Sequence, residues 1–161
     1  QGRVTAHHAR AVALYPEPYF RKIAALLKRA QIGVISDPQT GPLYAKVRDL
    51  YDEGIAVALG QDDIADAYYP YGRNNLLEVA FLASHLMWMT TFEEMEILYD
   101  LITTRAAQAM AIPGFEMKEG NQANLVVLNA ESVWEALTYH EAPRHVIKDG
   151  KEVTGFQEKA K

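Results

Sequence analysis

The feature that most constrains the fold of this chain is an uninterrupted apolar run at residues 55–59, which stops at a glycine, a glutamine and two aspartates. A strand that is apolar at every position is typical of a parallel sheet covered on both faces. Shorter apolar runs at residues 4–6 and 34–36 precede it, with helix-like segments between them. Because short helical crossovers return a chain in the parallel sense, we predict an α/β fold with a parallel sheet.

Apolar residues recur at helical spacing in five further segments. We expect Gly33 to stop the first of these helices, Asn74 to cap the third, and Thr91 with Glu94 to form a capping box at the start of the fourth. The helical patterns lie at residues 18–30, 45–53, 74–89, 91–102 and 104–111.

The character of the sequence changes after Pro113. We predict strands at residues 125–128 and 133–137, and a hairpin at Asp149 and Gly150, a pair that favours a tight turn. An eight-unit barrel needs about 250 residues, so a chain of 161 residues is either a small open sheet or the last portion of a barrel. The expected divisions are a partial (β/α) barrel at residues 1–112, a β-sandwich segment at 113–156 and a polar tail at 157–161.

Composition excludes several classes of function. The net charge of -5 offers no basic surface for nucleic acid or an anionic membrane. The absence of cysteine excludes disulfides, thiolate-bound zinc and thiol catalysis. No apolar run is long enough to span a membrane, and the start has no leader pattern, so we expect a cytoplasmic protein. The chain opens in a strand-like run without Met, which we interpret as a piece of something longer.

Reactive side chains follow each predicted strand. His7 and His8 end the first, Asp37 the second, and Asp62 with Asp63 the third. Because sites in parallel α/β proteins form at the carboxyl ends of the strands, these residues are the candidate site. On an extended chain His7 and His8 point to opposite sides, so only one can face a shared centre.

Each of these residues also has a structural interpretation. An aspartate pair suits a turn, but carboxylates after a buried strand also suit Zn, Fe or Mn beside imidazole. A histidine at a strand end can serve simply as a hydrogen-bonded structural residue. The remaining histidines are interpreted as structural or surface residues: His85, His140 and His145.

Taken together, these residues resemble the bacterial cytosine deaminase branch of the metal-dependent amidohydrolase superfamily. The resemblance runs over residues 3–153, and its most specific part is Gly-x-Asp-Asp followed by Tyr-Pro-x-Gly. The Gly-x-x-Ala-Asn-Leu-Val-Val-Leu element is shared more widely in the superfamily. The motifs lie at residues 3–8, 37–38, 60–63, 69–72 and 120–128.

The resemblance implies a (β/α)8 barrel with a β-sandwich, in which this chain supplies the sixth to eighth strands. It implies one divalent metal, Zn or Fe, held in part by Asp62, which also carries a proton as a catalytic residue. His8 would be the catalytic histidine that orients the water, and Asp63 would contact the substrate. Asp37 and Gln61 replace the family's usual Asn and His near the pocket, so both are expected to bind substrate.

The family's other metal ligands, a His-x-His and a further His, are not in this sequence. We therefore expect this chain to carry part of an active site for hydrolytic deamination of an aminopyrimidine such as cytosine or isocytosine. Alone, it should be inactive and hold metal weakly or not at all. The expected partners are a small-molecule pyrimidine, with no nucleic acid or membrane, and either a second copy or the missing N-terminal part.

Two other classes of function remain open. A non-catalytic α/β fragment could self-associate through an open sheet edge, or complement a missing N-terminal half. A receiver-like signalling domain would explain an acidic pair at a strand end. The acidic pair of such a domain should lie early in the chain, which disfavours this alternative.

Overall fold

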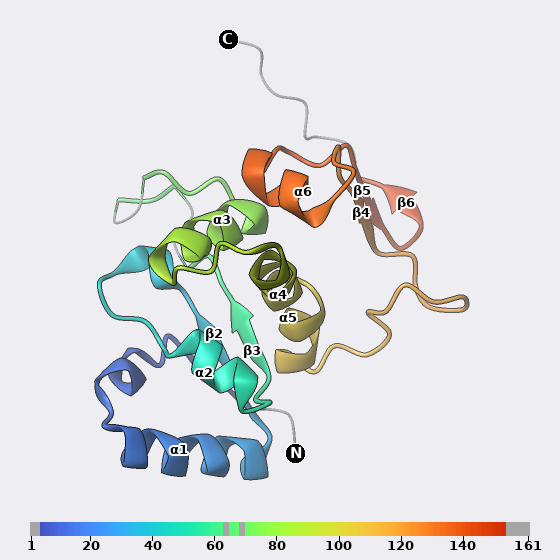
Figure 1. Cartoon of the computed structure of the whole chain (residues 1–161). Helices are drawn as coiled ribbons and strands as arrows, with labels where there is room; N and C mark the ends of the chain where they lie inside the picture. Colours follow the sequence, from blue (N-terminus) through green and yellow to red (C-terminus); the bar gives the residue numbers. More distant parts are fainter. Residues whose placement is uncertain (1–3, 63–64, 68–69, 154–161) are drawn as a thin grey trace.

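The computed structural model describes residues 4–62, 65–67 and 70–153. Two small sheets lie at opposite ends of the chain, with helices between and around them (Figure 1). In chain order the elements are β1 Val4–His7, η1 Arg10–Leu14, α1 Glu17–Ala30, β2 Ile32–Ser36, η2 Pro38–Thr40, α2 Val47–Asp52, β3 Val57–Leu59, α3 Leu76–Leu86, α4 Phe92–Ile102, α5 Thr104–Ala109, β4 Leu125–Val127, α6 Val133–Tyr139, β5 His145–Lys148 and β6 Lys151–Glu152.

The N-terminal sheet confirms the prediction of parallel strands. Its order is β1-β2-β3, and both neighbouring pairs are parallel. The register pairs Val4 with Ile32 and Val34 with Val57. All three strands therefore end at one edge of the sheet, which is where the candidate residues follow them.

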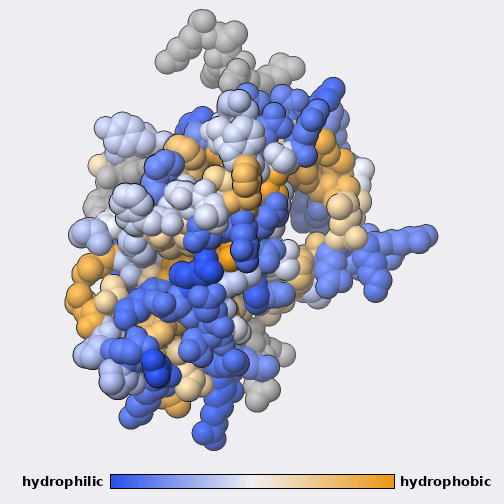
Figure 2. Space-filling model, in the orientation of Figure 1, coloured by the Kyte–Doolittle hydropathy of each residue, from blue (hydrophilic) through white to orange (hydrophobic). Residues whose placement is uncertain are grey.

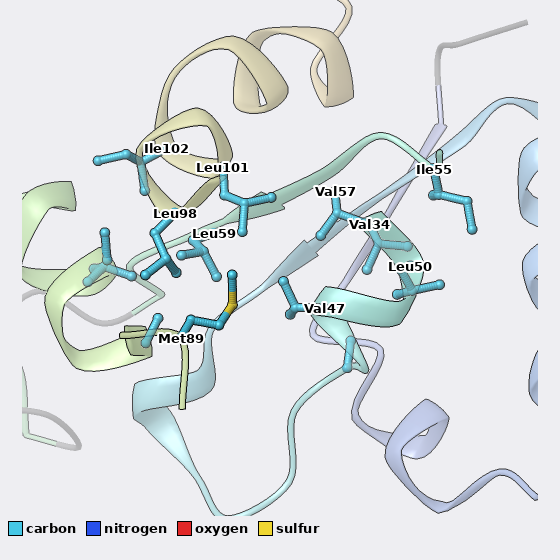
Figure 3. Close-up of a cluster of buried hydrophobic side chains, with 14 of the residues drawn as sticks. Val34, Val47, Leu50, Ile55, Val57, Leu59, Met89, Leu98, Leu101 and Ile102 are labelled. Carbon is cyan, nitrogen blue, oxygen red and sulfur yellow. The ribbon is translucent and has the colours of Figure 1, made fainter. Parts of the chain in front are cut away.

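Both faces of this sheet are covered, as the apolar sequence of β3 predicts. Val57 and Leu59 lie in the main core with Val34 and residues of α2, α3 and α4 (Figure 3). Ala58 points to the opposite face, where it packs with Ile35 against α5. Alternate side chains of a strand point to opposite faces, so a strand between two helical layers must be apolar throughout.

One predicted helix stop and one predicted cap are wrong. Helix α1 ends at Ala30, as predicted, but its C-cap is Gln31, which adopts a left-handed conformation with φ 53°, and Gly33 lies inside β2. A Cβ at Gly33 would stand 3.2 Å from the Cα of Ala109, so glycine is there because α5 lies against the strand. Helix α3 is capped by Asn75, whose side chain accepts a hydrogen bond from the N–H of Leu77; the predicted cap was one residue earlier.

The C-terminal region contains an antiparallel sheet in the order β4-β5-β6. The hairpin is confirmed, with φ of 53° at Asp149 and 74° at Gly150. The strand predicted at residues 133–137 is wrong, because this segment is helix α6. Its cap is Ser132, whose hydroxyl accepts from the N–H of Glu135, so the local polar pattern favours a helix start over a strand.

The two sheets differ in how far the apolar side chains of their strands are exposed. In the space-filling view, apolar atoms reach the surface in the part of the molecule that β4–β6 occupies (Figure 2). All three residues of β4 are exposed, whereas all three residues of β3 are buried. Within the residues that the structure describes, no helix is long and apolar enough to cross a membrane.

Candidate functional site

The predicted convergence of side chains at the carboxyl edge of the parallel sheet is found in the structure. His8 follows β1, Asp37 follows β2 and Asp62 lies three residues beyond β3. One ligand atom from each of the three lies within 4.8 Å of the others. Among the described residues, this is the group of histidine and carboxylate side chains close enough to share a cation.

The backbone turns sharply at two of these residues. His8 has φ 62° and Asp62 has φ 63°, both in the left-handed region, so the extended backbone predicted through His7 and His8 is wrong at His8. The His8 N–H still donates to the carbonyl of Ile35 at 2.8 Å, and the Ala9 N–H donates back to the carbonyl of His7 at 2.7 Å. Strained backbone of this kind clusters at functional sites, and here it turns His8 towards β2.

Asp37 is the centre of the hydrogen-bond network at the site. It is 5% exposed, and its Oδ1 lies 2.8 Å from Nδ1 of His8. Its Oδ2 accepts from Nη2 of Arg10 at 2.6 Å and from the hydroxyl of Thr40. Burial raises the pKa of this carboxyl, but the hydrogen bonds from Thr40, Arg10 and His8 outweigh burial and leave the pKa below its ordinary value. Asp37 is therefore a carboxylate at neutral pH.

Arg10 and Thr40 are site residues that sequence reasoning missed. Arg10 also donates from Nη2 to the Thr40 hydroxyl at 2.6 Å, so the two side chains hold the same oxygen of Asp37 together. Thr40 follows Asp37 by three residues, and its hydroxyl oxygen also lies 3.1 Å from the backbone carbonyl of Asp37, a local pattern typical of a side-chain turn. Arg10 lies 27 residues from Asp37, and the sequence holds no local sign of that pair.

The other predicted residues lie around this network. The Nε2 of His7 lies 3.2 Å from the Thr5 hydroxyl, whereas His8 bonds Asp37, so one histidine of the pair joins the shared centre. Gln39 donates to the backbone carbonyls of Gly60 at 3.0 Å and Gln61 at 2.8 Å, which fixes the exit of β3 against β2. Asp63 lies outside the described residues, and its substrate contact stays a prediction.

The remaining histidines make local structural contacts. His85 bonds the carbonyl of Phe81 at 3.0 Å, and His140 ends α6 in a left-handed conformation while its ring stacks on Phe81. His145 pairs with Glu152 across the β5–β6 hairpin at 2.7 Å. None of the three belongs to the group of side chains at the strand ends.

The donor set fits a divalent metal in part. Imidazole and carboxylate suit Zn and Fe, and His8 with Asp62 offers one of each. Both oxygens of Asp37 already accept hydrogen bonds from the chain. This carboxylate is therefore suited to orienting its neighbours and is a poor ligand for an ion. A tight site needs three or more protein ligands, and these two residues supply at most two.

The fold and the site together define a parallel α/β protein with a candidate metal centre at its strand ends. The chain belongs to the amidohydrolase family, whose model matches residues 1–154. Members of this family typically use a divalent metal, and the His8, Asp37 and Asp62 group is a place where one could bind.

Individual relatives agree with the family. The chain is 26% identical over 152 residues to the N-isopropylammelide isopropyl amidohydrolase of a Pseudomonas species. Its structure resembles 5-methylcytosine deaminase from Klebsiella pneumoniae, with a TM-score of 0.86, 30% identity and 94% of this chain covered. It also matches the fold of N-isopropylammelide isopropylaminohydrolase from Burkholderia multivorans, with a TM-score of 0.89, 24% identity and 95% covered. The chain spans 38%, 40% and 39% of these three proteins.

Proposed function

We propose that this chain is the C-terminal part of a metal-dependent amidohydrolase that removes the amine from an aminopyrimidine such as cytosine. The observation that carries the proposal is the grouping of donor atoms from His8, Asp37 and Asp62 within 4.8 Å at the carboxyl edge of the sheet. The similarity to 5-methylcytosine deaminase at 30% identity supports the choice of substrate class. We call the amidohydrolase that contains this chain together with the missing ligands "the longer protein".

In this proposal β1, β2 and β3 are the sixth, seventh and eighth strands of a (β/α)8 barrel, and residues 113–156 belong to a β-sandwich. The parallel order of the strands supports the assignment. So does the coverage of about two fifths of each relative, because three of eight strands is a similar share of a barrel. The first five strands would lie against the open edges of β1 and β3.

The proposed chemistry follows from the residue types. A divalent metal, when bound, acidifies a water molecule so that a nucleophile is available near neutral pH. Asp62 would help to hold the ion, accept the proton of the water and pass it to the departing amine. His8 would hold the water in line with the ring carbon and stabilise the charge that develops there. The water oxygen first adds to the ring carbon, the carbon–nitrogen bond then breaks, and the amine leaves as ammonia with the transferred proton.

The test is an assay of ammonia release by the longer protein, loaded with Zn or Fe, on cytosine, 5-methylcytosine and isocytosine. We expect turnover of at least one of these rings. The purified chain alone should release none and should lose its metal on dialysis against a chelator, because Asp62 is the one ligand that we assign in this chain and a tight site needs three or more. A stoichiometric metal that survives the chelator in the chain alone would contradict the proposed ligand set.

A second substrate class belongs in the same assay. The relative matched over 94% of this chain is named for hydrolysis of N-isopropylammelide. Gln61, where the cytosine deaminase branch often has His, is consistent with a different ring. Release of isopropylamine without ammonia from any pyrimidine would favour this second class and leave the proposed metal chemistry intact.

The non-catalytic alternative rests on one observation, the apolar β4 strand that this chain leaves exposed. A fragment with such a strand could pair with a second copy or with a missing half. Sedimentation of the purified chain, with and without the N-terminal part, distinguishes these outcomes. Self-association that persists beside the N-terminal part, together with no turnover by the mixture, would favour the non-catalytic role.

A further inference from the structure

The network around Asp37 has a role that the resemblance to cytosine deaminases does not supply. We infer that Asp37 is a positioning residue, held by Arg10, that sets the orientation and tautomer of His8, and is not a contact to the substrate ring. The inference rests on the proposed function, in which His8 orients the water.

The geometry at His8 fixes where its proton lies. A carboxylate only accepts hydrogen bonds, so the bond of 2.8 Å between Nδ1 of His8 and Oδ1 of Asp37 requires a proton on Nδ1. In the neutral ring Nε2 then carries the lone pair. A histidine bound in this way through one nitrogen presents the other in a fixed direction, as carboxylate partners do for catalytic and metal-binding histidines.

The opposite oxygen of Asp37 is held just as firmly. Arg10 and Thr40 both donate to Oδ2, and Arg10 also donates to Thr40. With 5% of its surface exposed and both oxygens engaged, Asp37 has little surface left for a ring. Its buried carboxylate links the exit of β1 to the exit of β2, so the position of His8 depends on the anchor at Arg10.

The space for Arg10 is built into the backbone at Gly41. A Cβ added at Gly41 would stand 2.8 Å from Nη1 of Arg10, too close for any real contact. The φ of Gly41 is 171°, extended backbone that any residue adopts, so glycine is not required there for the turn. Glycine has no side chain, and this leaves room at position 41 for the guanidinium of Arg10.

The principal variant is Asp37→Asn in the longer protein. Arg10 and Thr40 are donors, so they hold the amide oxygen of the new side chain and leave its NH2 group facing His8. Nδ1 of His8 must then accept, and the ring proton moves to Nε2. Nitrogen NMR of protein labelled at histidine should show this reversal of tautomer. We expect kcat to fall by about 10- to 100-fold with little change in KM.

The second variant, Gly41→Ala, reaches the same network without touching Asp37. It should displace Arg10 and lower kcat by about tenfold, a loss within the usual range for a partner beyond the reacting groups. The loss should vanish in an Arg10→Ala background, because the added methyl group then meets open space. A loss of equal size in both backgrounds would show that Gly41 acts without Arg10.

Each outcome decides between the roles. A raised KM with a changed preference among substrates, at unchanged kcat and unchanged tautomer, would make Asp37 a ring contact and overturn the inference. A lower melting temperature with the tautomer unchanged would leave Asp37 a purely structural role. If the unmodified protein turns over no substrate, the proposed function fails, but the tautomer of His8 with and without Asp37→Asn still decides the inference.

Discussion

Two apolar strands of this chain look alike in sequence and have opposite surroundings. Strand β3 reads Val-Ala-Leu and β4 reads Leu-Val-Val. Every residue of β3 is buried, at 2% exposed or less, whereas Val126 at the centre of β4 is 60% exposed. Burial in β3 comes from helices on both faces, whereas among the residues that the structure describes nothing buries the side chains of β4. Local sequence thus predicts a strand, and only the packed neighbours decide whether the strand is core.

The same difference in burial distinguishes the candidate functional site from a histidine–carboxylate pair that only stabilises local structure. His8 and Asp37 meet at the edge of the covered sheet, and the carboxylate of the pair is buried. His145 and Glu152 meet at a similar distance on the exposed hairpin, with both side chains open to water. The two histidine side chains are similarly exposed, at 46% for His8 and 44% for His145, so their carboxylate partners make the difference. The side chain of Asp37 is 6% exposed and is held by Arg10 and Thr40, whereas that of Glu152 is 56% exposed. The covered sheet therefore gives His8 a fixed direction that His145 does not have.

The largest effect expected from this comparison is on turnover. Asp62→Asn in the longer protein should lower kcat at least about 10³-fold, or about 4 kcal/mol in the activation barrier, and weaken metal retention. His8→Asn should lower kcat comparably but leave the metal bound, since we assign His8 to the water and Asp62 to the ion. Metal analysis beside steady-state kinetics checks both.

The matched control is His145→Asn on the exposed hairpin, for which we expect kcat within about twofold of the unmodified protein. Equal loss of metal in the Asp62→Asn and His8→Asn variants would make His8 a ligand. A large effect at His145 would break the comparison between the two regions.

The next largest effect is on stability. Leu98 of α4 is fully buried against the parallel sheet (Figure 3), so Leu98→Ala should lower the free energy of unfolding by about 2–5 kcal/mol. Val126→Ala should change it by less than about 0.5 kcal/mol, because that side chain is already in water. Urea denaturation of the purified chain measures both. A Val126→Ala loss as large as that at Leu98 would mean that β4 is covered in solution, as by a second copy.

Much of the covered sheet could be predicted from sequence, because its patterns are local. Apolar runs gave the strands, and polar residues after them gave His8, Asp37 and Asp62. Parallel strands end at one edge, so residues far apart in sequence were expected to meet without any knowledge of their contacts. The capping box of Thr91 and Glu94 was equally local and is confirmed.

The features that could not be predicted depend on distant partners or on backbone turns. Arg10 has its partner, Asp37, 27 residues away, and no local sequence pattern predicts that the two side chains meet. The left-handed turns at His8 and Asp62 follow from how each strand exits into its loop. Helix α6 was missed for another reason, because a short apolar segment suits a strand as well as a helix. Its Ser132-x-x-Glu135 cap was the local sign that favoured a helix.

A smaller effect is expected at the contact between the two regions. Asn75 caps α3 through Oδ1 and donates from Nδ2 to the carbonyl of His140 at the end of α6, at 2.9 Å. Asn75→Asp keeps a good cap but loses that donor, so it should lower the free energy of unfolding by about 1 kcal/mol. Asn75→Ala also loses the cap and should lower it by about 1 kcal/mol more.

The control for both is Asn74→Gly, which preserves the positive φ of 54° at that position and should be neutral within about 0.5 kcal/mol. Urea denaturation compares the three variants. If Asn75→Asp is also neutral, the bond to His140 does not couple the two regions.

The smallest effect is one of pH, at the start of the helix that lies between the two regions. Glu94 accepts hydrogen bonds from the N–H groups of Thr90 at 2.9 Å and Thr91 at 3.0 Å. The bonds from Thr91, with that from Thr90 and the charge of Arg48, outweigh the small opposing effect of burial and hold the pKa of Glu94 below its ordinary value. A carboxyl with a lowered pKa stabilises the fold above its unfolded pKa, about 4.3, and this stabilisation is lost as the pH falls through the folded value.

Glu94→Gln should therefore lower the melting temperature of the purified chain at pH 7. The difference in melting temperature between the variant and the unmodified chain should disappear as the pH falls below about 4. Glu93→Gln, which removes a charge from the same first turn without removing the box, is the matched control for the helix dipole. Helix α4 packs both on β3 and on α6, so fraying at its start loosens the covered sheet and the exposed region together. A difference in melting temperature that stays constant down to about pH 3 would show that the hydrogen bonds of the Glu94 side chain, and not its charge, stabilise the start of α4.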